Sequence, residues 1–323
     1  ERDTIVNVWS TTKTMAATAL LVLADRDELD LDAPIATYWP EFAANGKEAI
    51  TMAQVMGHTA GLPGWVPSIA VEDLYDQDAC AANLAAQAPW WEPGTMSGYH
   101  LITQGYLEAE VVRRITGRTI GTFFREELAE PLGADIHIGL PDSEEPRVAH
   151  LVPPADALGV VSGMDPDSIA IRAGTSVGVT GAEPNTRAWR AAEIPAAGGT
   201  GNARGVARVH AVLANGGTLD GRTYLSPASV DRIFVEQCHQ VDAVLGVKMR
   251  LGTGFGLMND LIPLSPNPRS CFWGGWGGSI CVIDVDAGVS IAYVMNRMAG
   301  GLVGDMRGAM VVLAAMGSLS AAG

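Results

Sequence analysis

Apolar residues recur at helical spacing in several parts of the chain. The longest such run, residues 10–25, is apolar on most faces and therefore predicts a helix buried at the centre of the fold. Residues 98–117 place apolar side chains three and four positions apart, and Gly117 is suited to end that helix. The same pattern predicts further helices over residues 52–56, 69–88, 119–130, 203–214 and 304–316.

Strand-like stretches gather towards the C-terminal end, at residues 251–258, 281–285 and 289–294. Residues 141–185 are rich in Pro, Gly, Asp and Ser. This composition predicts a long irregular segment that runs over the surface, with short strands around 168–173. We therefore expect one α+β domain over residues 1–323. A helical lobe would cover roughly 10–190, and an α/β lobe roughly 191–323 together with the N-terminal residues.

Composition and charge narrow the class of protein. The 323 residues are 48% hydrophobic and 18% charged, as in ordinary globular proteins. A formal net charge of −15 argues against nucleic acid and anionic membranes as partners, because both would be repelled. No apolar run is long enough to span a bilayer. No secretory signal is visible and we expect a cytoplasmic protein, although the chain opens on Glu1 and a leader could have been lost.

Cysteine and histidine patterns argue against a metal site. The four cysteines include no C-x-x-C pair, and the six histidines include no H-E-x-x-H, so neither zinc nor any other cofactor is expected. Cys271 and Cys281 could face each other across a hairpin, but buried free thiols are the commoner outcome. A reducing compartment fits this usage slightly better than an oxidising one.

Two serines are candidates for a nucleophile. Ser176 lies in GTSVG, which matches the G-x-S-x-G elbow of α/β hydrolases. That elbow needs a helix after the serine, whereas Gly181 and Pro184 disfavour one here, and neither His210 nor His239 lies in a recognisable triad loop. We therefore interpret the GTSVG stretch as a glycine-rich loop.

Ser10 has a more suitable context, in the stretch WSTTKTMAATALLVLA. It begins the buried helix, where free N–H groups and the positive end of the helix dipole lie at the nucleophile. Lys13 stands three residues later, on the same helical face. Burial would lower the pKa of Lys13 and make its amine a base. The alternative, a capping serine with a surface lysine, is weakened because the sequence that follows is too apolar for a surface.

A serine and lysine in this spacing, at the start of a buried helix, are the first of several motifs that occur in order. The second is EPGTMSGYHLITQGY, in which a Pro-Gly-Thr turn precedes Tyr99, and the third is FWGGWGGS. With HTAGLPGW and RAWRAAEIPAAGGTGNARGVARV, the chain resembles the serine β-lactamase and penicillin-binding-protein superfamily. Within it, the chain is most similar to family VIII carboxylesterases and class C β-lactamases, over nearly its whole length.

The resemblance implies the β-lactamase/transpeptidase-like fold, an antiparallel sheet flanked by helices with the active site between the sheet lobe and the helical lobe. It implies that Ser10 attacks an acyl carbonyl while Lys13 and Tyr99 share the proton transfers. The oxyanion hole would be the backbone N–H groups of Ser10 and Trp276.

Trp273, Gly274 and Gly275 would be the substrate-binding triplet of that family. The repeat WGGWGG also allows Trp276 to head the triplet, but Trp273 leaves Gly-Gly-Ser to continue as in the family. Tyr106, His58 and His100 are interpreted as structural residues. An apolar acyl pocket could be lined by tryptophans, and the candidates are Trp65, Trp90, Trp91 and Trp189.

Some positions depart from the family pattern. The family's β-lactamases carry Asn two residues after the tyrosine and favour Lys at the head of the triplet, where this chain has Leu101 and Trp273. The family also begins with a helix and strands before S-x-x-K, whereas nine residues precede Ser10. We therefore expect an esterase for small to medium esters, with a small-molecule ester as partner and a homo-oligomer as one possible state. A β-lactamase or D-amino-acid peptidase, an acyltransferase and a non-catalytic acyl-binding sensor are the alternatives.

Overall fold

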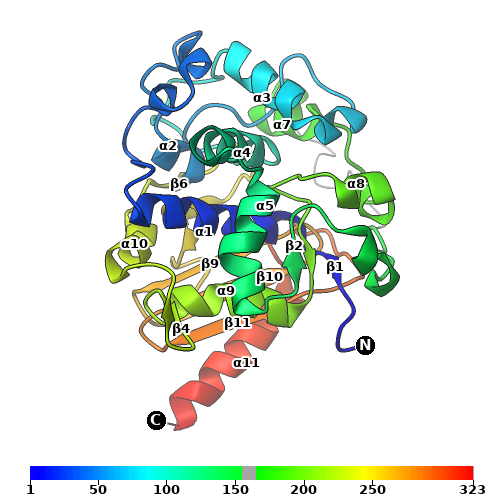
Figure 1. Ribbon diagram of the computed structural model, residues 1–323, viewed down its shortest axis with the longest axis vertical. Coiled ribbons are helices and arrows are strands. Elements are labelled where there is room, and N and C mark those ends of the chain that lie inside the picture. Colours follow the sequence, from blue (N-terminus) through cyan, green and yellow to red (C-terminus); the bar gives the residue numbers. More distant parts are fainter. Residues whose placement is uncertain (155–164, 323) are drawn as a thin grey trace.

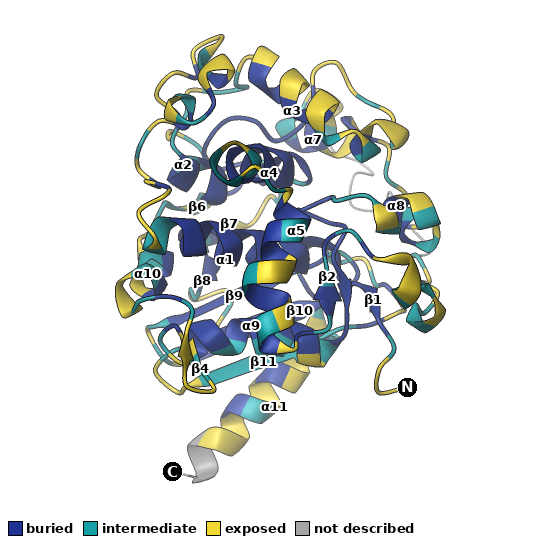
Figure 2. Ribbon diagram, viewed as in Figure 1, coloured by how far each residue is buried: buried dark blue, intermediate teal, exposed yellow. Residues whose placement is uncertain are grey.

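A single buried helix lies at the centre of the molecule. The computed structural model describes residues 1–154 and 165–322. Helix α1 (Thr12–Asp25) is buried along almost its whole length, as its apolar sequence predicts (Figure 2). In Figure 1, the helices α2 (Met52–Met56), α3 (Gln77–Ala86), α4 (Thr103–Thr116) and α7 (Ile169–Thr175) lie above α1. Helix α9 (Ala203–Ala214) and strands β9 (Ser270–Gly274), β10 (Ile280–Asp284) and β11 (Val289–Tyr293) lie below it. The start of α1 is thus placed between a helical layer and a sheet.

The larger sheet has the strand order β11-β10-β9-β8-β7-β6 and is antiparallel throughout. Its central strands are buried, whereas β11 forms a half-buried edge. The strands are β6 (Cys238–Val241), β7 (Lys248–Leu251), β8 (Gly256–Leu257), β9 (Ser270–Gly274), β10 (Ile280–Asp284) and β11 (Val289–Tyr293).

A second, smaller sheet joins the N-terminal residues to the segment that precedes α9. Strand β3 (Thr200–Gly201) pairs with β1 (Val6–Asn7) on one side and β2 (Ile136–His137) on the other. The Val8 N–H also donates to the Gly199 carbonyl at 2.8 Å. These contacts fix the chain just before Ser10. A separate hairpin is formed by β4 (Thr218–Leu219) and β5 (Arg222–Thr223).

Local capping signals explain several helix ends. Thr51 and Gln54 form a reciprocal capping box at the start of α2, and Gly117 adopts the left-handed conformation that ends α4. The remaining helices are α2 (Met52–Met56), α3 (Gln77–Ala86), α4 (Thr103–Thr116), α5 (Ile120–Phe124), α6 (Glu130–Leu132), α7 (Ile169–Thr175), α8 (Arg187–Ala191), α9 (Ala203–Ala214), α10 (Pro227–Asp231) and α11 (Met306–Ala322).

The α+β class and most predicted elements are confirmed, with some differences. Residues 203–214 and 52–56 are helical as predicted. The stretch around 168–173, predicted as strand, is instead helix α7, because Ser168 caps it by accepting from the Ile171 N–H. Residues 98–102, predicted as the start of a helix, precede α4 instead. Strand β9 is not among the strands that the hydrophobic pattern predicts.

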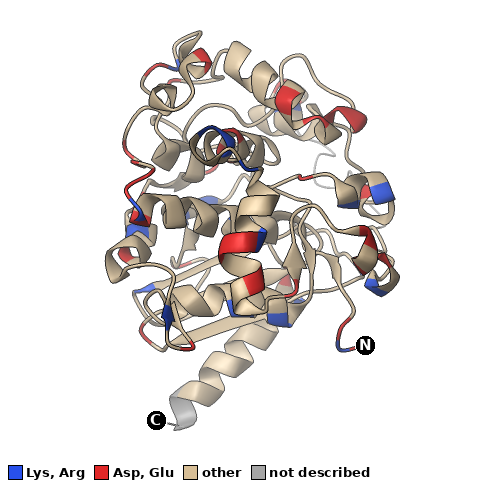
Figure 3. Cartoon of the chain, viewed as in Figure 1, with Lys and Arg blue, Asp and Glu red and all other residues tan. Residues whose placement is uncertain are grey.

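Helix α11 carries no Lys, Arg, Asp or Glu after Arg307, and Figure 3 draws it almost entirely in tan. Among the described residues, no helix has both the length and the apolar content that a membrane span requires. Cys271 and Cys281 are free, and they do not face each other, since Cys281 pairs with Trp273 and Cys271 with Ile283.

Candidate active site

Ser10 and Lys13 lie next to each other at the start of α1. Ser10 sits in a single 3₁₀ turn, Trp9–Thr11, that leads directly into the helix. Its side chain is nearly buried, and the Lys13 amine lies 3.2 Å from its hydroxyl oxygen. The predicted pair is thus brought within hydrogen-bond distance by the geometry of one helical turn.

The Lys13 amine is enclosed by oxygen acceptors from other parts of the chain. It donates to the carbonyl oxygens of Leu101 at 2.6 Å and Ala196 at 3.0 Å. No ion pair to Lys13 occurs within the described residues, and its side chain is 1% exposed. Burial lowers the pKa of Lys13 to about 7, against a smaller opposing effect of the Glu108 carboxyl.

Tyr99 lies on the irregular segment before α4, and the face of its ring lies under the Lys13 amine. The Lys13 amine is 4.8 Å from the centre of its ring. His58 contacts the ring edge-on at 4.9 Å, and Trp273 packs against it at 5.5 Å. Burial raises the pKa of Tyr99 well above its ordinary value. The nearby Ser10 hydroxyl and Trp273 side chain act weakly in the other direction, but neither makes a hydrogen bond of regular geometry with the phenol.

The Trp-Gly-Gly triplet runs along the end of β9 beside Ser10. A Cβ atom on Gly275 would lie 2.3 Å from the Val8 carbonyl oxygen and 3.0 Å from the Ser10 nitrogen. Only glycine permits this approach of the two backbones. A Cβ on Gly274 would similarly lie 2.4 Å from the Gly304 nitrogen. The next residue, Trp276, lines the same pocket as Ser10 and Tyr99.

The pocket at these residues has a volume of about 150 Å³. A cavity of roughly this size holds a molecule such as benzene. No side chain that lines it, among the described residues, carries a formal charge. The main apolar groups in its wall are Trp9, Trp65, Leu101, Val244, Trp276 and Leu302. The pocket therefore suits a small, neutral group.

Only one of the four tryptophans predicted for this pocket lines it, namely Trp65. Trp189 packs behind Trp9 at 5.4 Å, and Trp90 lies under the Arg172 guanidinium. Trp91 packs on His100 instead of facing the pocket. The residue that sequence reasoning missed is Trp9, whose position directly before Ser10 was a usable signal.

Ser176 also lines the pocket, but no partner that would activate it is found in the described part of the chain. Its hydroxyl donates to the Ala173 carbonyl at 2.9 Å, at the end of α7. A helix therefore precedes this serine, where an elbow needs one to follow. His210 is buried against Val206 and Thr14, and His239 is exposed on β6. The glycine-rich-loop interpretation of GTSVG thus holds only in part, because the segment before Ser176 is helical.

The predicted structural roles of His58, His100 and Tyr106 agree with their hydrogen bonds. The His58 Nδ1 accepts from the His100 N–H at 3.2 Å, and His100 Nε2 accepts from the Leu62 N–H at 3.0 Å. Burial lowers the pKa of His58 well below its usual range and that of His100 to about 3. The Tyr106 hydroxyl donates to the Leu74 carbonyl at 2.5 Å.

Other features were not accessible from sequence. The Leu101 and Ala196 oxygens that surround Lys13 are backbone atoms, so no residue pattern marks them. Asp242, which binds the backbone of Tyr99, is distant in sequence. Within the described residues, no group of three His, Cys, Asp or Glu side chains is arranged to hold a metal ion.

Comparison with known proteins gives consistent matches over the whole chain. Residues 1–315 match the beta-lactamase family model. The chain is 37% identical to the esterase/beta-lactamase LipL of Mycobacterium tuberculosis, over 93% of this chain and 71% of that protein. A crystal structure of a family VIII carboxylesterase is 42% identical with a TM-score of 0.89, covering 98% of this chain and 84% of the other. A penicillin-binding protein homologue from Caulobacter crescentus is 40% identical with a TM-score of 0.90, over the same shares.

Proposed function

The chain belongs to the beta-lactamase family, and on that premise we propose that it is a serine esterase that hydrolyses small to medium neutral esters through an acyl-enzyme on Ser10. The proposal joins the esterase activity named for its relatives to the chemistry of its own site. Four groups take part: a nucleophile, a base, an acid and a pair of backbone N–H donors.

The observation that carries the proposal is the set of oxygens around the Lys13 amine. A charged ammonium has three N–H donors, whereas a neutral amine has two and a lone pair. The charged form donates to the Leu101 and Ala196 carbonyls and to the Ser10 oxygen. In the neutral form two donors serve the two carbonyls, and the lone pair is left for the Ser10 hydroxyl. With a pKa of about 7, a large share of this amine is neutral at neutral pH. Lys13 is therefore the base that takes the Ser10 proton as its oxygen bonds to the ester carbonyl carbon.

Tyr99 acts as the acid. Burial keeps its phenol protonated, and its ring lies against the Lys13 amine. As the bond from the carbonyl carbon to the alcohol oxygen breaks, the phenol gives its proton to that oxygen and regains one from the protonated Lys13. Water then attacks the acyl-enzyme, passes its proton through the same two groups, and Ser10 leaves with a proton.

The charge that develops on the carbonyl oxygen is stabilised by the N–H groups of Ser10 and Trp276. The close approach of Gly275 to the Ser10 nitrogen supports this pairing, because it brings the following residue to the nucleophile. Trp273, Gly274 and Gly275 then form the strand edge along which the substrate lies.

The absence of charged side chains from the described pocket wall favours esters over β-lactams as substrates. The side chains at Leu101 and Trp273 provide no cation for a β-lactam's carboxylate, and the pocket wall has none elsewhere among the described residues. An opened β-lactam stays attached and must be held aside while water enters, whereas an ester's alcohol departs. The partner of the site is thus a neutral ester, and the net charge of −15 disfavours nucleic acid and anionic membranes. Four free cysteines favour the cytoplasm.

Two measurements test this function. An organophosphonate probe is expected to label the peptide that carries Ser10, and to leave it unlabelled in Ser10→Ala; labelling at Ser176 alone would contradict the assignment. The purified protein is expected to have a much higher kcat/KM for p-nitrophenyl butyrate than for nitrocefin. A clear preference for nitrocefin would instead establish a β-lactamase.

A further inference from the structure

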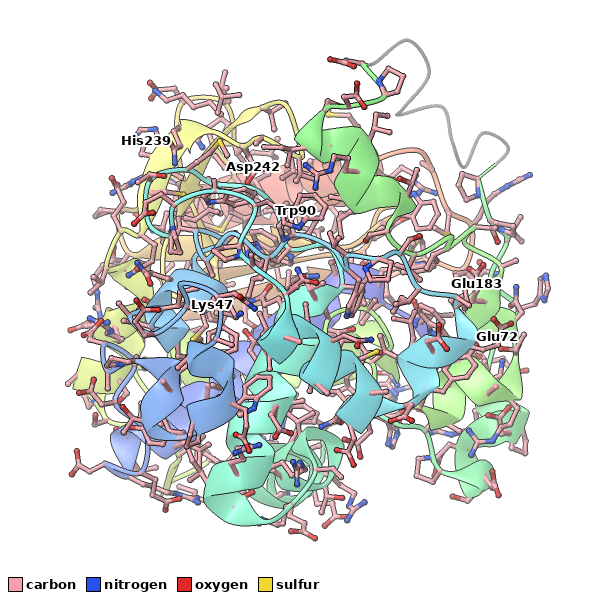
Figure 4. The ribbon with its side chains drawn as sticks, turned by 90° about the horizontal axis from the view of Figure 1, so that it is seen from above. Lys47, Glu72, Trp90, Glu183, His239 and Asp242 are labelled. Carbon is pink, nitrogen blue, oxygen red and sulfur yellow. The ribbon has the colours of Figure 1, made fainter. Side chains whose placement is uncertain are left out.

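Asp242 is a buried carboxylate that holds the backbone of Tyr99. It directly follows β6, is fully buried, and lies inward from the exposed His239 (Figure 4). Its Oδ1 accepts from the Tyr99 N–H at 3.0 Å and from the Val244 and Leu245 N–H groups, each at 2.9 Å. Its Oδ2 accepts from the Ser97 hydroxyl at 2.6 Å. One side chain thus joins two segments 143 residues apart.

Tyr99 depends on such contacts because its own side chain is weakly anchored. Within residues 1–154 and 165–322 the phenol makes no hydrogen bond of regular geometry, so ring packing and the backbone determine where it points. Helix α4 begins only at Thr103, so helical geometry does not hold Tyr99 either. The backbone is held by His58, which accepts from the Gly98 N–H at 3.0 Å, and by Asp242.

We propose that Asp242 is a positioning residue that sets the place of the Tyr99 phenol relative to Ser10 and Lys13, and that it fixes Val244 in the pocket wall through the same oxygen. This inference rests on the proposed function, in which Tyr99 is the acid. Asp242 acts through its acceptor geometry, since three N–H groups converge on Oδ1.

The charge of Asp242 is not what the reaction uses. A nearby negative charge disfavours ionisation of Tyr99, and Asp242 contributes in that direction, but only as the smallest of several influences. Asparagine keeps an oxygen for the three N–H groups and loses the charge. Glutamate keeps the charge and moves the oxygens outward by one methylene. The two substitutions therefore separate geometry from charge.

The experiment measures kcat and KM for p-nitrophenyl butyrate in Asp242→Asn and Asp242→Glu. A misplacement on the order of 1 Å can cost a catalytic step about 100-fold, so kcat in Asp242→Glu is expected to fall at least roughly tenfold. Asp242→Asn is expected to retain kcat within about threefold, because its acceptor oxygen remains. An equal kcat in the two variants, or a lower kcat in Asp242→Asn, would overturn the proposal.

Asp284 provides a matched control. It is buried at the end of β10 and accepts from Ser265, Asn267 and the Ala287 N–H, away from the pocket. Asp284→Asn and Asp284→Glu are expected to change the melting temperature and leave kcat of the folded protein unchanged. If disturbing any buried carboxylate lowered kcat, then kcat would fall to the same extent in the Asp284 variants as in the Asp242 variants.

Measurements of kcat in the Tyr99→Phe variant separate this inference from the proposed function. In Tyr99→Phe, Asp242→Glu is expected to cause little further loss of kcat, because the group that it displaces is already absent. A full additional tenfold loss would show that Asp242 acts elsewhere. If Tyr99→Phe alone leaves kcat near normal, the acid assignment fails in itself. If Tyr99→Phe is severe while both Asp242 variants are unaffected, only the positioning role fails.

Discussion

Ser10 and Lys13 stand three residues apart on one helix, whereas Tyr99 lies on an irregular segment and is held by a carboxylate 143 residues farther along the chain. The first pair needs only the helical period to meet. The tyrosine needs the β6–β7 connection, the His58 loop and the sheet to be in place. The helix half of the site, Ser10 and Lys13, is therefore local in origin. The tyrosine half, Tyr99 with the residues that hold it, depends on the whole fold.

The same burial has opposite effects on the two halves. It lowers the pKa of Lys13 to about 7 and raises that of Tyr99, because it disfavours the charged form of each group. The amine becomes an available base, and the phenol stays a proton donor. In the proposed mechanism, burial thus suits the two groups to the roles of base and acid, and no ion pair to Lys13 occurs among the described residues.

Removing either half is expected to have the largest effect. Lys13→Ala and Tyr99→Phe should each lower kcat/KM for p-nitrophenyl butyrate by roughly 10²–10⁴-fold, as general acid–base groups do. The double variant should lose much less than the product, because the two act as one unit. Tyr106→Phe, which removes a hydroxyl that donates to a backbone carbonyl, is the control for a buried tyrosine. Near-normal activity in Tyr99→Phe would mean that the helix half acts alone.

The pH dependence of kcat/KM in the wild-type protein is expected to follow the protonation of Lys13, in the helix half of the site. Because the base must be neutral, kcat/KM should fall below about pH 7, by about tenfold per unit, and so about 100-fold at pH 5. The groups that face Lys13 are Tyr99, Glu108, His58 and His100, and both histidines stay neutral in this range. An acid limb with a midpoint above pH 9 would contradict a buried amine as the base.

Stability should change with pH through the same amine. In the unfolded chain the lysine pKa is about 10.4, so between about pH 7 and pH 10 the unfolded state binds more protons at this site than the folded state. The contribution of Lys13 to the free energy of unfolding therefore rises with pH across that window. Urea melts of Lys13→Met should lack this contribution, and the difference from wild type should reach its full size at and below about pH 7.

The periodicity of apolar residues was sufficient to predict the elements that depend only on residues close in sequence. The helix at 203–214, the buried helix after Ser10 and the Ser10–Lys13 pair all follow from a 3.6-residue period. Residues 98–102 have the same period but are not helical, because their N–H groups bind Asp242 and His58 instead. Strand β9 lies outside the stretches that periodicity predicts as strands. The pocket role of Trp9 depends on partners far along the chain, and its signal in the sequence is its position directly before Ser10.

Trp9 offers a smaller test of which half sets substrate size. Its backbone is in the left-handed region at φ 48°, and its ring packs on Trp276 at 4.9 Å in the pocket wall. Trp9→Ala and Trp9→Gly should both raise kcat/KM for p-nitrophenyl octanoate relative to butyrate by about tenfold, since each lost contact opens apolar space.

Glycine and alanine at position 9 should differ in stability instead. Alanine keeps a Cβ in the left-handed conformation, at a cost of about 1–2 kcal/mol, and glycine does not. Trp9→Gly should therefore melt at the higher temperature of the two. Val244→Ala, on the tyrosine side of the pocket, is the matched control, and an equal change in chain-length preference there would mean that both halves set substrate size.

The smallest expected effect connects the two halves through Glu108 on α4. Its carboxyl is fully buried and accepts from the Gln104 amide at 2.7 Å, and burial raises its pKa to about 8. When ionised it favours the charged form of Lys13, although burial is the larger influence on that amine. Because the Glu108 carboxyl is mostly protonated at the pH of the acid limb, Glu108→Gln removes only a weak attraction and should shift the acid limb of kcat/KM to lower pH by a small fraction of a pH unit. Glu110→Gln, on the same helix but paired with Arg113 and Arg114, should leave the limb unmoved. A shift of the limb to higher pH in Glu108→Gln would mean that the carboxyl acts on Tyr99 rather than on the amine.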